Sequence, residues 1–266
     1  MIHFHRPVPA RVAAIGLTAL LFSAPACQVK YASAPKSGPP APPRLLSWRV
    51  AAAYLDDIFA TIPDSSIDDL RKDTPPEERR LVNAAHGETG IKDDNAHVYG
   101  EPAPATTDLM LNRLAVNPDD VLYDLGCGRG FFLMQALLTS PIRKAVGVEL
   151  AASRVRIGLR ARQLMLEQGL LGAKVLDLRE QDMTRTRMDD ATLVYLDSVF
   201  FSDQLLADVA RTMSRAKNLR KVVMIMKGLP PNPWFELEAT ERWKMSWSPR
   251  FGSDVLFYRR SAAPAG

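Results

Sequence analysis

Val121-Leu-Tyr-Asp-Leu-Gly-Cys-Gly-Arg-Gly130 is the stretch of this 266-residue chain that decides its fold, together with Val146-Gly-Val-Glu149 downstream. An apolar strand runs into a glycine-rich turn and a helix, and a second apolar strand ends in a carboxylate. This is the pattern of a nucleotide-binding βαβ unit. The turn has neither the Lys-Ser/Thr pair of a phosphate-binding loop nor the Gly-x-Gly-x-x-Gly spacing that seats a pyrophosphate. Asp124 ends the first strand instead, which favours a ligand that carries positive charge there.

The glycine turn and the acid that ends the second strand resemble the first two motifs of class I S-adenosylmethionine-dependent methyltransferases. The resemblance implies that the turn packs against the methionine part of the cofactor and that Glu149 accepts hydrogen bonds from both ribose hydroxyls. Charge-assisted hydrogen bonds of this kind contribute about 1.5–3 kcal/mol each. A tight turn in another kind of α/β protein, with Glu149 solvated, is the alternative. The residues expected to bind S-adenosylmethionine here are Asp124, Gly126, Cys127, Gly128, Gly130 and Glu149.

A second element, His97-Val-Tyr-Gly-Glu101, precedes the helix that leads into the first strand. It resembles a loop of the histone lysine methyltransferases named for disruption of telomeric silencing, the DOT1-like family, which fold this loop over the cofactor. The resemblance implies that Glu101 meets the methionyl amino group and that Tyr99 lines a channel for the acceptor lysine. Pro102 departs from the family, which usually has a hydroxyl residue there. An ordinary turn into a helix is the alternative interpretation.

Two further positions follow from the same comparison. Asp182 resembles the acid that contacts the adenine amino group in the superfamily, and Asp197 takes the place of the second Asn in the family's Asn-Asn-Phe-x-Phe stretch. Only a neutral amine can attack the methyl group, and a lysine with a pKa of about 10.4 is neutral in roughly one molecule per thousand near pH 7.4. An ionised Asp197 therefore holds the ammonium for docking, accepts its proton, or serves a different substrate.

The remaining periodicity predicts an α/β, Rossmann-like class I methyltransferase fold. Apolar runs predict strands over 121–124, 145–149, 174–178, 191–196 and 221–226, and helical spacing predicts helices over 106–114, 130–139, 152–168 and 202–213. Residues 235–247 and 254–259 alternate like a hairpin around Ser248-Pro249. By resemblance, five βα units closed by this antiparallel hairpin give a seven-stranded sheet.

A leader and a linker are expected ahead of the catalytic part. A basic start, a short apolar run and Ala24-Pro-Ala-Cys27 describe a secretory signal peptide or a lipoprotein leader, with a lipid at Cys27 or ordinary cleavage after Ala26. An organelle transit peptide and an unused leader are alternatives. Export conflicts with a cofactor made in the cytosol, so an envelope-anchored or exported location and a cytoplasmic one both stay open. The expected regions are a leader (1–27), a Pro/Ala-rich linker (28–44), a helical segment (45–95) and the methyltransferase domain (96–260).

The helical segment is expected to pack by one broad apolar face. A second helix is predicted after Pro75-Pro76, with Glu77 and Glu78 in its first turn. The residues expected on the buried face of the first helix are Trp48, Val50, Ala51, Tyr54, Leu55 and Ile58.

Charge and cysteine content limit the possible partners. The formal net charge of +4 is mild, and it permits an anionic partner without arguing for one. Arg154, Arg156, Arg160 and Arg162 share a predicted helix without forming one stripe, so we expect them to be solvated and infer no strong nucleic-acid signal. The two cysteines and four histidines show no metal-ligand spacing, and no metal is predicted.

These observations predict an S-adenosylmethionine-dependent methyltransferase that acts on a protein lysine outside the nucleosome, with Tyr99 and Asp197 as catalytic residues. An export-type leader points away from histones, and no long basic tail that would add phosphate contacts is expected. A small-molecule methyltransferase, with residues 45–95 as a lid, is one alternative. An envelope-anchored domain that keeps the fold without turnover is the other.

Overall fold

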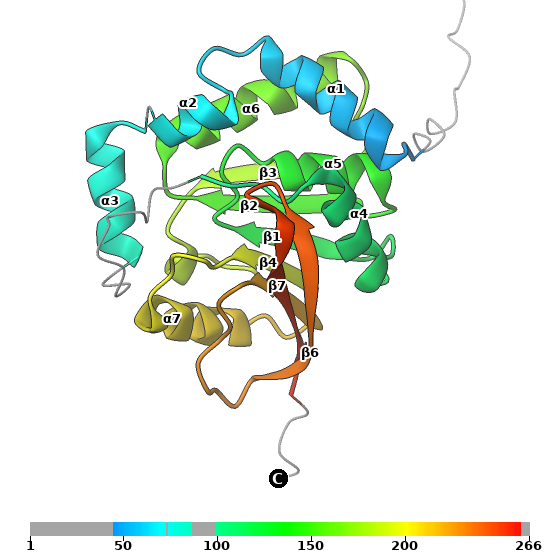
Figure 1. The fold of residues 1–266 in the computed structure, drawn as a ribbon. Coiled ribbons are helices and arrows are strands. Elements are labelled where there is room, and N and C mark those ends of the chain that lie inside the picture. Colours follow the sequence, from blue (N-terminus) through cyan, green and yellow to red (C-terminus); the bar gives the residue numbers. More distant parts are fainter. Residues whose placement is uncertain (1–44, 73, 87–98, 262–266) are drawn as a thin grey trace, which may run out of the picture. The chain divides into compact units, whose positions relative to one another are not determined.

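The computed structural model describes residues 45–72, 74–86 and 99–261. They form a mixed seven-stranded sheet in the order β3-β2-β1-β4-β5-β7-β6 (Figure 1). Strands β1 to β5 are parallel, and β7 runs antiparallel to both of its neighbours. The strands are β1 (Val121–Leu125), β2 (Lys144–Glu149), β3 (Val175–Glu180), β4 (Leu193–Asp197), β5 (Lys221–Ile225), β6 (Phe235–Met245) and β7 (Ser248–Arg260). The predicted fold class, a Rossmann-like sheet closed by an antiparallel hairpin, is confirmed.

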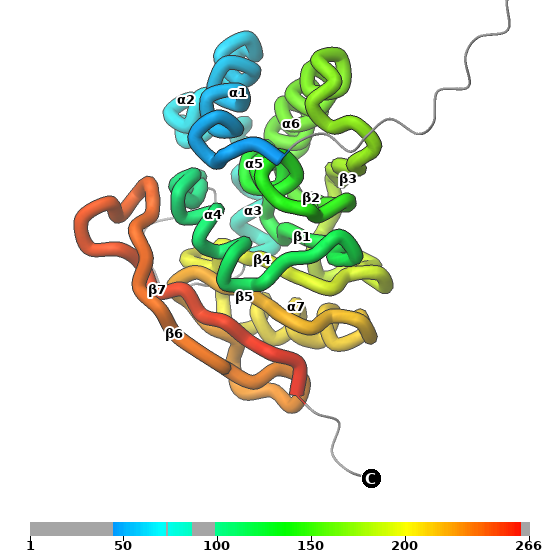
Figure 2. The backbone as a smooth tube through the Cα atoms, turned by 90° about the vertical axis from the view of Figure 1, so that its right-hand side faces the viewer, coloured from blue at the N-terminus to red at the C-terminus, as the bar shows by residue number. Residues whose placement is uncertain are grey.

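Helices cover the two faces of this sheet unequally. The helices are α1 (Trp48–Ala60), α2 (Ile67–Lys72), α3 (Pro76–His86), α4 (Pro104–Arg113), α5 (Phe131–Thr139), α6 (Ala152–Glu167) and α7 (Asp203–Ser214), with a 3-10 turn η1 (Met183–Arg185). Helices α1, α4, α5 and α6 pack on one face, and α7 packs on the other (Figures 1 and 2). Because side chains alternate along a strand, Leu122 joins the first core and its neighbour Tyr123 joins the second.

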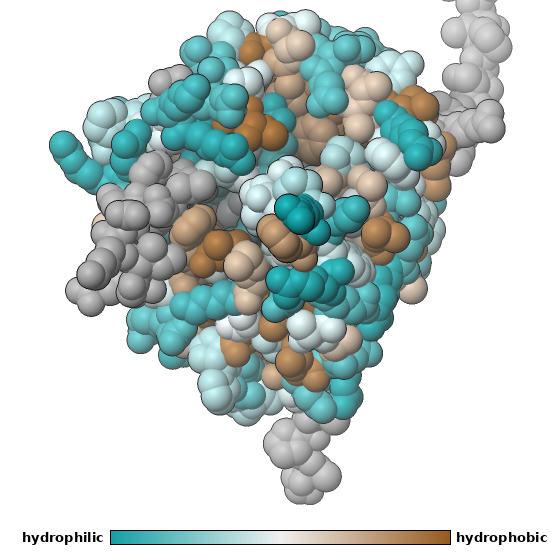
Figure 3. All heavy atoms as spheres, viewed as in Figure 1, coloured by the Kyte–Doolittle hydropathy of each residue, from teal (hydrophilic) through white to brown (hydrophobic). Residues whose placement is uncertain are grey.

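Two features relevant to membrane contact are the distribution of apolar residues on the surface and the length and polarity of the helices. On the face shown in Figure 3, apolar residues are interspersed with hydrophilic ones, which is the usual distribution on a protein surface. Within the described ranges, the helices are too short or too polar to cross a membrane.

The strand order fixes where a site can form. From β1 the chain adds β2 and β3 on one side and then β4 and β5 on the other. In open α/β sheets, ligands bind at the carboxyl ends of the strands where the order reverses in this way. Asp124 near the end of β1, Glu149 at the end of β2 and Asp197 at the end of β4 therefore meet at one edge of the sheet.

One prediction about the elements is wrong. The hairpin turns at Ser246-Trp247 rather than around Ser248-Pro249, because β7 pairs with β6 as far as Ser248, which lies opposite Met245. After β3, where no helix was predicted, the chain forms the 3-10 turn η1, which the Asp182 side chain caps before the chain extends toward β4.

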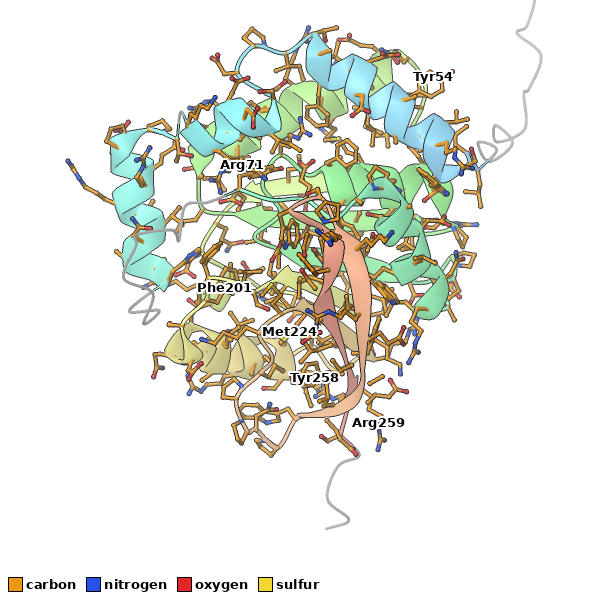
Figure 4. The ribbon with its side chains drawn as sticks, in the orientation of Figure 1. Tyr54, Arg71, Phe201, Met224, Tyr258 and Arg259 are labelled. Atoms are coloured by element: carbon orange, nitrogen blue, oxygen red, sulfur yellow. The ribbon has the colours of Figure 1, made fainter. Side chains whose placement is uncertain are left out.

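The buried face of α1 is narrower than predicted. Four of the six residues are buried or half-buried: Trp48, Ala51, Leu55 and Ile58. Val50 and Tyr54 are each 44% exposed, and Tyr54 lies on the outer side of α1 (Figure 4). The helix touches the rest of the chain along a stripe at three- and four-residue spacing, so positions beside the stripe face outward.

Several predictions concern residues that the structure does not describe. The leader, the linker, Cys27, and the 87–98 stretch with His97 and Val98 lie outside the described residues. The boundaries of the four predicted regions therefore stay predictions. The second helix of the 45–95 segment is present, and α3 begins at Pro76 with Glu77 and Glu78 in its first turn, as expected.

Gly158 lets α6 approach the glycine turn. A Cβ atom added there would lie 2.7 Å from the carbonyl oxygen of Arg129 and 2.8 Å from Leu178. Replacing glycine by alanine inside a helix ordinarily stabilises a protein by up to about 1 kcal/mol, but here α6 must move away from the turn. We expect Gly158→Ala to lower the free energy of unfolding by about 1–3 kcal/mol, measured by urea denaturation.

The control for this prediction is Arg160→Ala, which changes an exposed residue of the same helix. It should alter the free energy of unfolding by less than about 0.5 kcal/mol. A Gly158→Ala variant as stable as the wild type would contradict the close packing of α6 on the turn.

Candidate active site

A cavity of about 400 Å³ opens at the carboxyl ends of β1, β2 and β4. This volume lies within the range of small-molecule sites. Arg71 of α2 and Phe201 of the β4–α7 loop line it, and both lie on the side of the sheet where α3 is found (Figure 4). Every residue predicted for the site except Gly130 lines this cavity: Tyr99, Glu101, Asp124, Gly126, Cys127, Gly128, Glu149, Asp182 and Asp197.

The glycine turn is fastened to Glu149. The carboxylate of Glu149 accepts hydrogen bonds from the backbone N–H groups of Gly128, Leu150 and Ala151, each at 2.9 Å. The three glycines of the turn have positive φ, as the motif predicts. A carboxylate has roughly four acceptor positions, so about one stays free in this arrangement, which is room for one ribose hydroxyl rather than the two expected.

Asp124 carries a buried oxygen without a partner. The residue is 3% exposed, and its Oδ1 accepts no hydrogen bond from the described residues. Burial and nearby carboxylates, Glu149 first among them, raise the pKa of Asp124 well above its usual value. A cation beside Asp124 would pair this carboxylate and offset the repulsion from its neighbours. The arrangement therefore favours a ligand with positive charge at this point.

Glu101 is held by Arg129, which lies inside the glycine turn. Arg129 donates from Nε and Nη2 to the two carboxylate oxygens of Glu101, at 2.7 and 2.9 Å. The Tyr99 hydroxyl also donates to Glu101. Arg129 and Glu101 are 5% and 7% exposed, so they form a buried ion pair.

Tyr99 packs on the backbone of the turn. A Cβ atom at Gly128 would lie 2.2 Å from the Tyr99 ring, so a glycine is needed there. The Tyr99 hydroxyl accepts a hydrogen bond from the backbone N–H of Arg129 at 3.3 Å. Burial raises the pKa of Tyr99 well above its usual value, which keeps the phenol neutral. Tyr99 thus forms a wall of the cavity with its hydroxyl turned toward Glu101, and its role in an acceptor channel stays a prediction.

Asp197 has the ionisation expected of a proton acceptor. The residue is partly exposed, but its Oδ1 is buried and unbonded among the described residues. Burial raises the pKa of Asp197 to about 7, against the opposing hydrogen bond from the backbone N–H of Val199. A carboxyl with a pKa near neutrality can take up and release a proton at physiological pH.

Asp182 and Cys127 also line the cavity. Oδ1 of Asp182 accepts hydrogen bonds from the backbone N–H and the hydroxyl of Thr184, at 2.8 and 2.7 Å. The sulfur of Cys127 faces Gly147, where a Cβ atom would lie 2.5 Å away, and burial raises the pKa of this thiol well above its usual value. Among the residues that the structure describes, no group of His, Cys, Asp and Glu side chains could hold a metal ion.

The cavity also contains residues that were not predicted for the site from the sequence. Trp247, at the hairpin tip, lies against Gly100, where a Cβ atom would be 3.0 Å from the indole ring. His86, at the end of α3, lies 4.8 Å from Phe201 between ring centroids, and burial lowers the pKa of His86 to about 4. No local pattern marks these residues, because they reach the cavity from separate elements.

One prediction about α6 is wrong. Arg154 was expected to be solvated, yet it is 6% exposed, and its guanidinium lies 5.1 Å from the centre of the Tyr99 ring. The first turn of α6 follows directly after Glu149, so its inward side faces the cavity rather than solvent.

A family model described as "Histone methylation protein DOT1" matches residues 89–238, which is more than half of the chain. The match includes the 99–101 loop, the glycine turn and the acids that end β2 and β4. The chain belongs to the DOT1 family.

Two proteins illustrate what this DOT1 family member is similar to in sequence. A protein-lysine N-methyltransferase of Saccharolobus islandicus is 41% identical over 64 residues, which cover 24% of this chain and 40% of that protein. An H3 lysine-79-specific histone-lysine N-methyltransferase of Debaryomyces hansenii is 26% identical over 145 residues, which cover 51% of this chain and 12% of that protein. The chain therefore spans less than half the length of each.

Among solved structures, an RNA methyltransferase from Salinibacter ruber in complex with S-adenosyl-L-homocysteine is similar to this chain. The two are 22% identical, with a TM-score of 0.46, and the match covers 63% of this chain and 98% of the other.

S-adenosylmethionine is the cofactor of this DOT1 family member, and the cavity residues fit it. Its sulfonium and ammonium groups are cations, which the unpartnered oxygen of Asp124 and the carboxylate of Glu101 can receive. A Cβ atom at Gly126 would point into space bounded by Phe201 at 3.6 Å and Met183 at 3.8 Å, so the glycine leaves room for a ligand against the backbone. When bound, the cofactor supplies an electrophilic methyl group on sulfur.

Glu149 is the residue whose replacement tests the cofactor end of this site. Glu149→Gln keeps the size of the side chain but loses one acceptor oxygen, so it cannot serve the backbone N–H groups and a ribose hydroxyl together. We expect the affinity for S-adenosylmethionine to fall about ten- to a hundred-fold, measured by calorimetric titration. Glu180→Gln is the control, because this exposed acid ends the neighbouring strand β3 opposite Glu149. Wild-type affinity in Glu149→Gln would show that the ribose assignment is wrong.

Proposed function

We propose that this protein is an S-adenosylmethionine-dependent methyltransferase that N-methylates a protein lysine outside the nucleosome. The observation that carries the proposal is a pair of carboxylates, Asp124 and Asp197, in one largely apolar cavity, whose buried Oδ1 atoms have no hydrogen-bond partner among the described residues. One acid suits the positive charge of the bound cofactor, and the other suits an acceptor that is itself a cation. The similarity to a protein-lysine N-methyltransferase supports the lysine assignment.

The two acids lie on neighbouring strands, two residues apart in register. Asp124 of β1 lies opposite Tyr195 of β4, and Asp197 lies two residues further along β4. Two residues of a strand span about 7 Å. A cofactor cation near Asp124 and an amine near Asp197 would thus lie within reach of each other along the sheet, as methyl transfer between two positioned reactants requires.

The walls near Asp197 suit the aliphatic stem of a lysine. Val199, two residues after Asp197, lines the cavity, and so does Met226, which follows the Ile225 that pairs with Asp197. Met226 is 52% exposed and has a φ of +63°, a backbone conformation that is uncommon outside glycine. Strained residues of this kind cluster at functional sites. An apolar rim over an acid recognises a side chain with a hydrophobic stem and a charged tip.

Asp197 gives the chain a means of removing the amine proton. With a pKa of about 7, the Asp197 carboxylate is largely ionised above neutrality and can accept a proton from a docked ammonium. The neutral amine is then free to attack the methyl group. Tyr99, whose raised pKa keeps its phenol neutral, lines the same cavity and donates its hydroxyl proton to Glu101.

The choice of a non-nucleosomal acceptor rests on charge. Nucleosome binding depends on many Lys and Arg side chains that contact phosphates together. On α6, Arg154 is buried and Arg156 lies 3.8 Å from Glu78 of α3. With a mild net charge of +4, these contacts support an acceptor other than DNA-wrapped histone.

The direct test incubates the purified full chain with S-adenosylmethionine that carries a labelled methyl group. Lysine-containing peptides, recombinant nucleosomes and a free polyamine are offered as acceptors. We expect label on peptide lysine, located by mass spectrometry, and none on nucleosomes. Label on the polyamine alone would favour a small-molecule methyltransferase, and failure to bind the cofactor at millimolar concentration would favour a domain without turnover.

Asp197→Asn tests the proton-acceptor role. An Asn cannot take up the proton, so the rate should fall, and the wild-type rise in rate with pH through about 7 should disappear from the pH profile. An Asn variant with the wild-type rate and pH profile would rule out the role.

The same variant has an expected effect on stability. Because the pKa of Asp197 is raised in the folded state, the contribution of Asp197 to wild-type stability falls as pH rises from about 4 to about 7. The Asn variant should therefore unfold at higher urea concentration than the wild type at pH 8, and at a similar one near pH 4.

A further inference from the structure

We propose that Arg129 is a positioning residue of the cofactor site, which holds Glu101 in place for the methionyl amino group and links this contact to the N-terminal helices. The inference rests on the proposed function and on the expected role of Glu101. It concerns a residue inside the glycine turn that faces away from the cavity.

Arg129 reaches from the turn to the N-terminal helices. Its Nη1 donates to the carbonyl oxygen of Ser65, in the loop between α1 and α2, at 2.7 Å. Its guanidinium lies 4.0 Å from the centre of the Phe59 ring of α1 and 5.3 Å from that of Phe131. The side chain therefore joins α1 and its following loop to Glu101 through a single residue.

Glu101 is fixed from three sides. Arg129 holds both carboxylate oxygens, the Tyr99 hydroxyl donates to one of them, and the Ser246 hydroxyl donates to the Glu101 backbone carbonyl at 2.6 Å. The carboxylate itself receives three hydrogen bonds, two from Arg129 and one from Tyr99, so about one of its four acceptor positions stays free. One N–H of an ammonium group can use that position, so a fixed Glu101 suits an amino group approaching from the cavity.

The buried ion pair of Arg129 and Glu101 is not needed for the stability of the fold. A buried ion pair adds little stability compared with apolar residues of the same volume, because both charges lose their hydration. Its benefit is a fixed geometry, since the planar guanidinium fork allows the carboxylate few orientations. A geometric role predicts that losing Arg129 weakens ligands with an amino-acid end and spares those without one.

The chain offers a matched control at the opposite edge of the sheet. Arg220 donates from Nε and Nη2 to the two oxygens of Asp120, at 3.0 and 2.6 Å, and from Nη1 to the carbonyl oxygen of Leu114 at 3.2 Å. This is the same set of contacts that Arg129 makes with Glu101 and Ser65. Neither Arg220 nor Asp120 lines the cavity.

The experiment titrates two ligands into the full chain by calorimetry. S-adenosylhomocysteine has the amino-acid end, whereas 5′-methylthioadenosine keeps the adenosine and the thioether but lacks that end. For Arg129→Met we expect about ten- to a hundred-fold weaker binding of S-adenosylhomocysteine and less than about a three-fold change for 5′-methylthioadenosine. Arg220→Met should leave both affinities unchanged.

Two milder variants keep the test decisive if Arg129→Met fails to fold. Arg129→Lys keeps the charge without the fork, and Phe59→Leu removes the ring beneath the guanidinium. Both should show the same ligand-selective loss, at smaller size. Equal loss for both ligands, or none for S-adenosylhomocysteine, would overturn the positioning role. A wild-type protein that binds neither ligand would overturn the proposed function as well, which distinguishes the two failures.

Discussion

A turn with glycine at three of its five positions has few side chains with which to hold its own shape, and the rest of this structure supplies them. Glu149 accepts the N–H of Gly128, and the Tyr99 ring covers the same residue. Gly158 admits the first half of α6 against the turn. Because these contacts come from β2, the 99–101 loop and α6, the backbone conformation of the turn is set before a ligand arrives. Such pre-organisation reduces the ordering cost of binding.

The carboxylates around this turn differ in the groups that hydrogen-bond or pair with them. Backbone N–H groups satisfy Glu149, and a guanidinium fork satisfies Glu101. Asp124 and Asp197 each keep a buried oxygen without a partner in the described chain. Burying a carboxylate costs free energy unless a hydrogen-bond donor or a cation pairs with it. Asp124 and Asp197 therefore mark the positions where a positively charged ligand group would be stabilised. Groups with perturbed ionisation in a cavity are candidates for function, and here they coincide with the strand ends that the topology brings together.

Local rules and the family resemblance account for what the sequence could predict. A period of two residues locates the strands, the resemblance singles out Glu149 and Asp197 beside the strand-end Asp124, and the carboxyl-end rule for parallel sheets explains why the three acids lie at one edge. The same rules cannot find Arg129, because its Ser65 partner lies 64 residues away and nothing in the glycine motif announces it. They also placed too much of α1 in the core. Helical periodicity gives the direction of a buried face, but its width depends on the surface against which the helix packs.

Asp197 stands where the resembling family motif has Asn, and this acid bears on whether the cofactor binds before the acceptor amine loses its proton. An ionised acid stabilises the ammonium form of a neighbouring lysine, and a lysine pKa of about 10.4 against about 7 for Asp197 leaves proton transfer uphill by roughly 4–5 kcal/mol. Positive charge bound near Asp124, about 7 Å along the strand direction, opposes the ammonium and favours its deprotonation. Under the proposed function, the acceptor proton would therefore leave most readily when the cofactor is already in place, and Asp197 would serve as its acceptor only in the ternary complex.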